Sequence, residues 1–214
     1  MNNSICTLFD NILIDIHKFK SLQNKKRGKV ERGKIFSFAE TKYEWNMKEI
    51  SVSELQDNMF DAIGKEWMLV TAGTQDKFNM MTASWGGTGI LWGKPVAFIF
   101  IRPERYTYEF IEEGDKLTLS FLGEEHKDVH KICGSKSGRD MDKVAASGLK
   151  PYVMEDGTIS YEQARLVLVC KKLYADMIQE DKFVDKLLIN RWYGEGHGNL
   201  HKMYILEIQH VYVK

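Results

Sequence analysis

Two segments of the chain combine cationic side chains with hydroxyl groups, an arrangement that suits a bound anion. The first (RPERYT) spans residues 102–107 and the second (GSKSGRD) spans residues 134–140. Arginine offers paired planar donors, lysine a point charge, and hydroxyl and helix-start N–H groups complete a phosphate cradle. For either segment alone, an equal alternative is that Thr107 and Ser137 cap helices while the cations meet water or carboxylates. Two such segments together favour one phosphorylated ligand.

A third segment, residues 80–87 (MMTASWGG), places small residues where an expected strand ends. A flat ligand could lie against the main-chain donors there, with Trp85 as a wall. The alternative is a strand end that turns at Gly86 and Gly87, with Trp85 packed in the core. Taken alone, this alternative is the commoner arrangement.

Other kinds of site find less support in the sequence. The P-loop spacing fails because Thr88 stands where its first glycine is required, and the glycines of residues 194–198 alternate too tightly for a dinucleotide motif. His126 and His130, four residues apart, have a metal-like spacing, as do His197 and His201. Neither pair has the glutamate of a metalloprotease motif, and no metal is expected.

Strands must position most of these segments. Residues 67–73, 78–84, 95–101, 117–121, 164–173 and 203–213 are predicted as strands. Within this set, the unbroken apolar run 95–101 predicts a fully buried strand and the alternation in 117–121 a half-buried one. Short helices are expected at residues 107–113, 124–132 and 140–147, the last closed by Gly148. This order favours an antiparallel, mainly β barrel with inserted helices over a parallel sheet.

The composition is that of one ordinary globular domain. The chain has 214 residues, of which 43% are apolar and 28% charged. Thirty basic side chains balance thirty acidic ones, so no nucleic acid or membrane partner is expected for the protein as a whole. Three sparse cysteines fit a reducing cytoplasm, and no apolar run approaches the roughly 20 residues of a membrane span.

Residues 1–46 differ from the rest because eight basic side chains crowd between Lys18 and Lys34. We interpret this part as a poorly ordered basic extension, or as sequence upstream of a start at Met47, and residues 47–214 as the folded domain. An alternative is a short amphipathic helix with a cationic tail that binds a membrane or nucleic acid. The barrel would then be a scaffold only.

Three ordered motifs resemble the flavin reductase-like FMN-binding family, and flavoredoxin-type members above all. They are NMMTASWGG at residues 79–87, KPVAFIFIRPERYT at 94–107 and CGSKSGRD at 133–140. The resemblance continues through residues 164–174 and 201–208, and so covers essentially Met47 to the end. Two departures stand out: residues 1–46 have no counterpart, and Leu206 stands where similar proteins commonly carry glycine.

The resemblance implies a split-barrel homodimer, Greek-key-like in its antiparallel topology, with FMN near the subunit interface. The flavin ring would lie against the main chain of residues 82–85, and the other two motifs would meet the phosphate. The FMN contacts implied by the motifs are Thr82, Ala83, Ser84, Trp85, Arg102, Arg105, Tyr106, Thr107, Ser135, Lys136, Ser137, Arg139 and Asp140.

The leading functional hypothesis is an oxidoreductase in which NAD(P)H, bound transiently, reduces FMN and the electrons pass to a free flavin, a metal complex or a redox protein. The nearest alternative is an electron carrier of the flavoredoxin type without NAD(P)H turnover of its own. Flavin chemistry is intrinsic to the cofactor, so no catalytic triad is needed. His201 is a weak candidate for positioning nicotinamide or moving a proton, and a satisfied or surface histidine is the commoner case.

Overall fold

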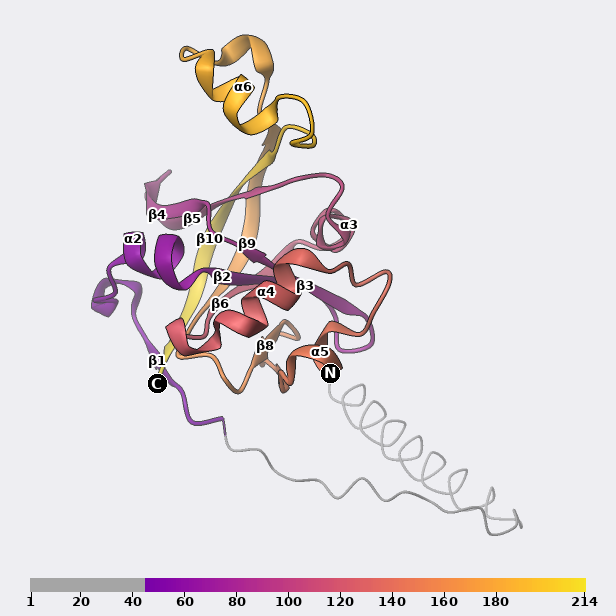
Figure 1. Ribbon diagram of the computed structural model, residues 1–214. Helices are drawn as coiled ribbons and strands as arrows, with labels where there is room; N and C mark the ends of the chain where they lie inside the picture. Colours follow the sequence, from indigo (N-terminus) through magenta and orange to yellow (C-terminus); the bar gives the residue numbers. More distant parts are fainter. Residues whose placement is uncertain (1–44) are drawn as a thin grey trace, which may run out of the picture. The chain divides into compact units, whose positions relative to one another are not determined.

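The computed structural model describes residues 45–214, and most of these lie in one antiparallel sheet (Figure 1). The sheet contains β1 (Lys48–Ile50), β2 (Met68–Gly73), β3 (Phe78–Ala83), β4 (Gly86–Leu91), β5 (Lys94–Ile101), β6 (Lys116–Phe121), β9 (Leu166–Met177) and β10 (Lys202–Val213). A separate hairpin contains β7 (Pro151–Val153) and β8 (Ile159–Tyr161). All six strands expected from the sequence are present.

The strands follow the order β3-β2-β6-β9-β10-β5-β4, with β1 paired to the far end of β10. Every pairing is antiparallel, and the two end strands, β3 and β4, are not paired with each other. The sheet is therefore mainly antiparallel and curved but not closed, which confirms the predicted class. The hypothetical amphipathic helix and basic tail lie outside the described residues.

Short helices fill the connections between the strands. They are η1 (Val52–Glu54), α2 (Met59–Asp61), η2 (Ala62–Glu66), α3 (Tyr106–Glu113), η3 (Glu124–His126), α4 (Lys127–Ser135), α5 (Lys143–Ser147), η4 (Glu180–Lys182) and α6 (Leu187–Tyr193). The helix expected at residues 140–147 begins later, because Asp142 caps it by accepting from the N–H groups of Val144 and Ala145. Gly148 closes it in the left-handed conformation, as predicted.

The burial predicted for two strands was wrong in both cases. Alternate residues of β5, such as Phe98 and Phe100, are only partly buried, whereas β6 is almost entirely buried. β6 lies in the middle of the sheet, and the β7–β8 hairpin covers its polar face. There Thr118 donates to the carbonyl of Ile159, and the hydroxyls of Ser120 and Ser160 are 3.0 Å apart. The alternating polar positions of β6 therefore face protein rather than water.

Two further expectations concern positions in the sheet that carry glycine here or commonly carry it in similar proteins. Gly86 and Gly87 do not form a turn but begin β4, and a Cβ on Gly86 would lie 2.4 Å from the carbonyl oxygen of Phe98. Glycine is needed there because β4 approaches β5 closely. Leu206, which stands where similar proteins commonly carry glycine, is fully buried and pairs with Ala97, beside a register shift at which β9 has one extra residue. The small neighbour leaves room for the leucine side chain.

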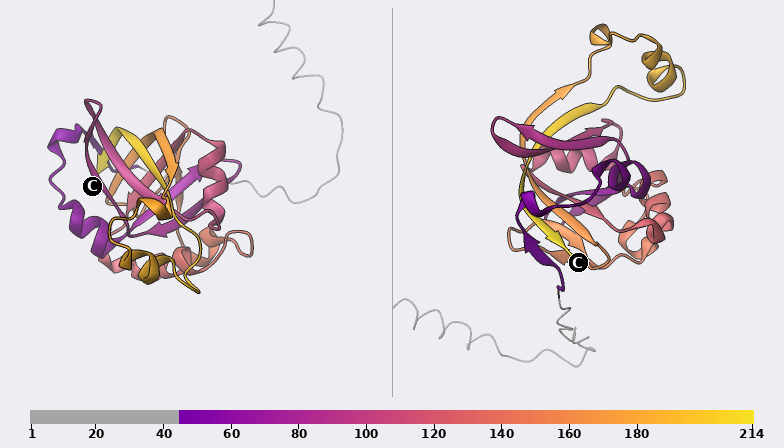
Figure 2. Two further views of the ribbon diagram at one scale, coloured as in Figure 1. Left: turned by 90° about the horizontal axis from the view of Figure 1, so that it is seen from above. Right: turned by 90° about the vertical axis from the view of Figure 1, so that its left-hand side faces the viewer.

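Residues 178–201 form an arm between β9 and β10 that carries η4 and α6. Figure 1 and Figure 2 show this arm projecting beyond the end of the sheet that lies away from β1 and the C-terminus. Large apolar side chains on it are exposed, among them Val184, Leu187 and Trp192. Among the described residues, no helix has both the length and the apolar character needed to cross a bilayer.

Candidate functional site

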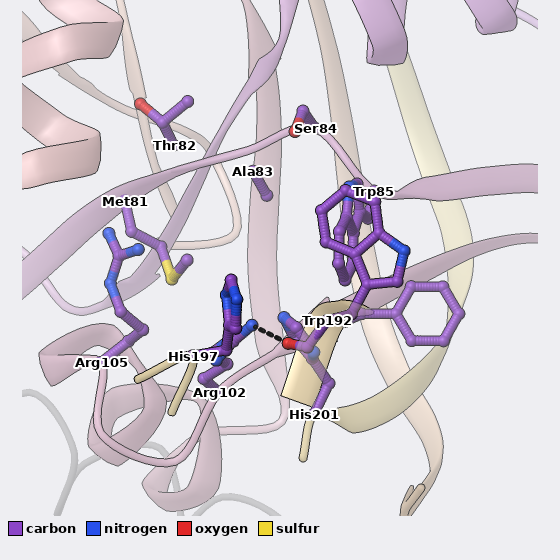
Figure 3. Close-up of a pocket in the computed structure, with 11 residues that line it drawn as sticks. Met81, Thr82, Ala83, Ser84, Trp85, Arg102, Arg105, Trp192, His197 and His201 are labelled. Atoms are coloured by element: carbon purple, nitrogen blue, oxygen red, sulfur yellow. Dashed lines mark hydrogen bonds between the residues drawn. The ribbon is translucent and has the colours of Figure 1, made fainter. Parts of the chain in front are cut away.

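Two adjacent pockets lie where the three motifs meet. The aromatic pocket, about 310 Å³, is lined by Met81, Thr82, Ala83, Ser84, Trp85, Phe100, Arg102, Arg105, Trp192, His197 and His201 (Figure 3). The cationic pocket, about 240 Å³, is lined by Glu104, Arg105, Tyr106, Thr107, Gly134, Ser135, Lys136, Ser137 and Lys143. Arg105 lines both pockets and so joins them into one candidate site.

Asn79 on β3 brings the three motifs together. Its side chain is buried, and its Nδ2 donates to Oγ1 of Thr107 at 2.7 Å. Thr107 therefore lies inside α3 as a buried acceptor, whereas Arg105 occupies the N-cap position of that helix. On the third motif, a Cβ added to Gly138 would lie 2.1 Å from Oδ1 of Asn79. Only glycine lets this loop approach the strand so closely.

Behind the aromatic pocket, Thr82 is anchored to α4. Its hydroxyl donates to the carbonyl of His130 at 2.8 Å and lies 3.3 Å from Nδ1 of the same residue. Because the hydroxyl proton is used, Nδ1 must donate in return, which leaves Nε2 as a buried acceptor with no partner among residues 45–214. The side chain of Thr82 thus turns toward α4, and its main chain faces the pocket.

His130 makes the fold sensitive to acid. Its side chain is 1% exposed, and burial lowers its pKa from 6.5 to about 4, with Lys127 and His126 adding to the effect. The unfolded chain therefore binds more protons between these two values, so the free energy of unfolding falls as the pH drops from about 6.5 to about 4. We expect His130 to account for about 2 kcal/mol of this loss between pH 6.5 and 4.5.

The variant His130→Asn tests this prediction because asparagine keeps a donor for Thr82 but does not titrate. Urea unfolding at pH 6.5 and 4.5 should show a smaller acid loss in His130→Asn than in the wild type. His126→Asn, just before α4, is the control; since His126 is the smallest of the three causes that lower the pKa of His130, the acid loss of this variant should stay close to that of the wild type. An equal acid loss in all three proteins would contradict the assignment to His130.

One end of the aromatic pocket is made of three rings in edge-on and tilted contact. The Trp85 ring lies 5.0 Å from that of Trp192 and 4.9 Å from that of His201, centroid to centroid. Trp85 is 36% exposed, so the alternative in which it packs in the core is wrong. His201 Nδ1 shares a 2.9 Å hydrogen bond with the hydroxyl of Tyr193. Burial, with Arg102, lowers the pKa of His201 to about 4, so the ring is neutral near pH 7 and suits positioning better than acid catalysis.

The opposite end of the candidate site is cationic. There Arg105 donates to the carbonyl of Cys133 at 3.4 Å. Arg102 lies at the aromatic end instead, where it donates to the main-chain carbonyl of Trp192 at 3.1 Å (Figure 3). Burial lowers the pKa of Arg105, and no carboxylate among the described residues forms an ion pair with it. The Glu104 carboxylate at the pocket instead accepts from the main chain and side chain of Asn199. The charge of Glu104 acts on Arg105 without forming an ion pair with it, and a partly buried guanidinium of this kind favours an anionic ligand.

The structure places most of the sequence-derived site residues at the two pockets. Eleven of the thirteen FMN contacts implied by the motifs line one or both pockets, and so does His201. The other two, Arg139 and Asp140, line neither. Arg139 pairs with Glu109, lies 4.6 Å above the Tyr106 ring and donates to the carbonyl of Glu104. It therefore braces α3 from outside the cationic pocket.

Several lining residues had no signal in the sequence. Trp192 and His197 come from the arm, which carries no motif, although the four-residue spacing of His197 and His201 is metal-like. Lys143 begins a helix and reads as an ordinary solvated lysine, yet it is buried beside the cationic pocket. Within residues 45–214, no group of three or more His, Cys, Asp or Glu side chains has the arrangement of a metal site.

Comparisons with solved structures show the same fold in several proteins. Solved structures of similar fold include an FMN-binding domain of a flavin reductase-like enzyme from Shewanella baltica, with 18% identity, TM-score 0.56, and 78% of this chain and 77% of that chain covered. Flavoredoxin of Desulfovibrio vulgaris has 23% identity and TM-score 0.53, with 69% of each chain covered. An NADH:FAD oxidoreductase from Streptomyces globisporus has 13% identity and TM-score 0.51, with 70% and 74% covered.

A search of curated proteins found no match to the chain. The family model described as flavin reductase like domain, in contrast, matches residues 60–214, which include every described residue of the candidate site. The neighbours in this fold are split-barrel FMN-binding domains, flavoredoxins among them. The chain therefore belongs to the flavin reductase-like domain family.

Proposed function

We propose that the protein binds FMN and transfers electrons from NAD(P)H through it to a free flavin, a metal complex or a protein acceptor. The observation that carries the proposal is the position of Arg105, which lines an aromatic pocket on one side and a cationic pocket on the other. A ligand with a flat ring and a phosphoryl group needs both environments, joined at one point.

The donor groups of the two pockets fit FMN. Guanidinium, ammonium and hydroxyl groups surround the cationic pocket. Residues 82–84 and the Trp85 side chain line the aromatic pocket. When bound, FMN would supply hydride and electron transfer from its own ring system. The chain itself would need to bind the phosphate, hold the ring and limit water.

Each part of the site has a separate role in this proposal. Arg105, with Lys136 and the hydroxyls of Ser135 and Ser137, holds the phosphate. The main-chain N–H groups after Thr82 orient the ring, and the hydrogen bonds from Thr82 to His130 keep that segment in place. Trp85 and Trp192 exclude water from the end of the pocket that lies away from Arg105.

A single observation favours the electron carrier as the second candidate. The aromatic pocket, at about 310 Å³, is near the lower limit for a drug-sized ligand, and Trp192 and His197 of the arm occupy one of its sides. A nicotinamide would have to displace part of the arm to lie against a bound ring. An electron carrier reduced by another protein would not need this space.

We further propose that the protein acts as a homodimer, with a redox protein or free flavin as its acceptor. The support is the arm, on which Val184, Leu187 and Trp192 expose apolar surface that a single copy leaves in water. Exposed apolar groups gathered on one projecting element favour an interface. Sedimentation of the purified full chain would show a dimer.

Freshly purified protein is expected to show the absorption of bound flavin, and the FMN-loaded protein is expected to oxidise NADH or NADPH with a flavin acceptor. Stopped-flow mixing would separate the two candidates. Fast reduction by a pyridine nucleotide supports the reductase, whereas slow reduction with fast exchange to a redox protein supports the carrier. If protein that has been stripped of flavin does not rebind added FMN, both the reductase and the carrier are contradicted.

A further inference from the structure

Lys143 is a buried cation that the three motifs do not include. Its side chain, at the first position of α5, is 4% exposed and lines the cationic pocket. Its Nζ donates to the carbonyl of Met80 at 2.9 Å and to the carbonyl of Cys133 at 3.1 Å. An ammonium group has three protons, and among residues 45–214 the third finds no protein acceptor.

These two hydrogen bonds hold Lys143 between segments that build both pockets. Met80 precedes the strand end at residues 82–85, and Cys133 lies in the last turn of α4, just before Ser135 and Lys136. Arg105 donates to the same Cys133 carbonyl from the third segment. The ammonium group therefore has a fixed position, unlike the exposed ammonium of Lys136, which must lose side-chain freedom to bind.

The charged groups around Lys143 provide no ion pair among the described residues. Glu104 lines the same pocket, but its carboxylate accepts from Asn199. From α4 the Cys133 thiol faces it, and burial raises the pKa of that thiol, which keeps it neutral. The Arg105 guanidinium adds a second positive charge, and β3 contributes a carbonyl but no ionisable side chain. No carboxylate in the described part of the chain forms an ion pair with Lys143. Burial, with Arg105, lowers the pKa of Lys143 to about 8.

We propose that Lys143 is a specificity-determining residue of the cationic pocket, whose buried ammonium selects the phosphate ester FMN over the uncharged riboflavin. The inference rests on the proposed function, because it assigns one further residue to the same site. The Lys143 ammonium has a fixed position, two carbonyl acceptors and one proton without an acceptor among the described residues. An anion would accept from that proton and balance the charge. A phosphate dianion provides the missing acceptor and the missing negative charge.

The affinity for FMN should depend on pH through the protonation of Lys143. Above pH 8 the free protein loses the Lys143 proton, whereas a bound phosphate favours the charged form and raises the pKa of Lys143. FMN binding is then linked to the uptake of a proton. The affinity for FMN should fall as the pH rises from 8 to 9, by up to about fivefold, and the affinity for riboflavin should not.

The test compares FMN and riboflavin binding to the full chain, measured as quenching of flavin fluorescence at pH 7.5. In Lys143→Gln the amide still donates hydrogen bonds to carbonyls but carries no charge. This variant should bind FMN about 10- to 100-fold more weakly and riboflavin within about threefold of the wild type. Lys131→Gln is the matched control, since it removes an exposed α4 lysine outside both pockets, and it should bind both ligands normally.

Lys143→Arg adds a second measurement because arginine stays charged above pH 8. The fall in FMN affinity between pH 8 and 9 should disappear in this variant while remaining in the wild type. If circular dichroism shows that Lys143→Arg does not fold, the pH profile of the wild type and the affinities of Lys143→Gln still test the proposal. A wild-type affinity for FMN that is flat across this range overturns the proposal.

The remaining outcomes are also distinguishable. If Lys143→Gln loses FMN and riboflavin alike, Lys143 supports the fold of the pocket and is not specific for phosphate, which overturns the inference. Unchanged FMN binding in that variant overturns it as well. In both cases wild-type FMN binding leaves the proposed function standing. If the wild type binds neither ligand, the proposed function fails and the inference fails with it.

Discussion

The variant Arg105→Gln is expected to bind FMN about 100-fold more weakly than the wild type. Arg105 lines both pockets and carries a partly buried guanidinium that forms no ion pair with a carboxylate in the described residues. Truncating one partner of a hydrogen-bonded, desolvated charge pair costs about 2–5 kcal/mol, and every 1.4 kcal/mol is a factor of ten in affinity. The loss of affinity is measured by isothermal titration calorimetry, in which FMN is added to protein that has been stripped of flavin.

Arg139→Gln is the matched control for this experiment. It removes the same charge from the motif that carries Ser135 and Lys136, but Arg139 is paired with Glu109 outside both pockets. We expect its FMN affinity to stay within about threefold of the wild type, since an exposed ion pair contributes at most about 1 kcal/mol. Equal losses in the two variants would mean that general positive charge, and not the position of Arg105, determines binding.

The variant Leu206→Ala is expected to lower the free energy of unfolding by about 3 kcal/mol. Leu206 is fully buried on β10, in the core cluster that also contains Ala97 and Ile99. Its cross-strand neighbour, Ala97, is too small to fill the space that the missing side-chain atoms would leave. Denaturant unfolding at pH 7, with the wild type at the same protein concentration, measures the difference.

Leu187→Ala makes the same substitution on the surface of the arm, where the leucine is 75% exposed. Its free energy of unfolding should stay within about 0.5 kcal/mol of the wild type. Should Leu206→Ala be as stable as Leu187→Ala, β10 would accept a small residue at this position as readily as the glycine of similar proteins. The leucine would then not be needed to fill the core.

The sequence was sufficient for the existence and type of the main elements. Alternating or unbroken apolar runs predicted all six long strands, and Gly148 predicted the end of α5, because these are local properties of the chain. The sequence did not decide which strand is central. The sequence pattern of β6 predicts a half-buried strand and that of β5 a fully buried one. In the structure β6 is the more buried of the two, because the β7–β8 hairpin covers Thr118 and Ser120.

The same distinction holds for the candidate site. The motifs located the segments, because backbone approach and anion binding require particular residue types such as Gly138 and Arg105. Only the tertiary structure decided which side chains face the ligand space, since this depends on what surrounds each one. Arg139 belongs to a motif but pairs with Glu109, whereas Lys143 belongs to none and is buried beside Arg105 because β3 and α4 close over it.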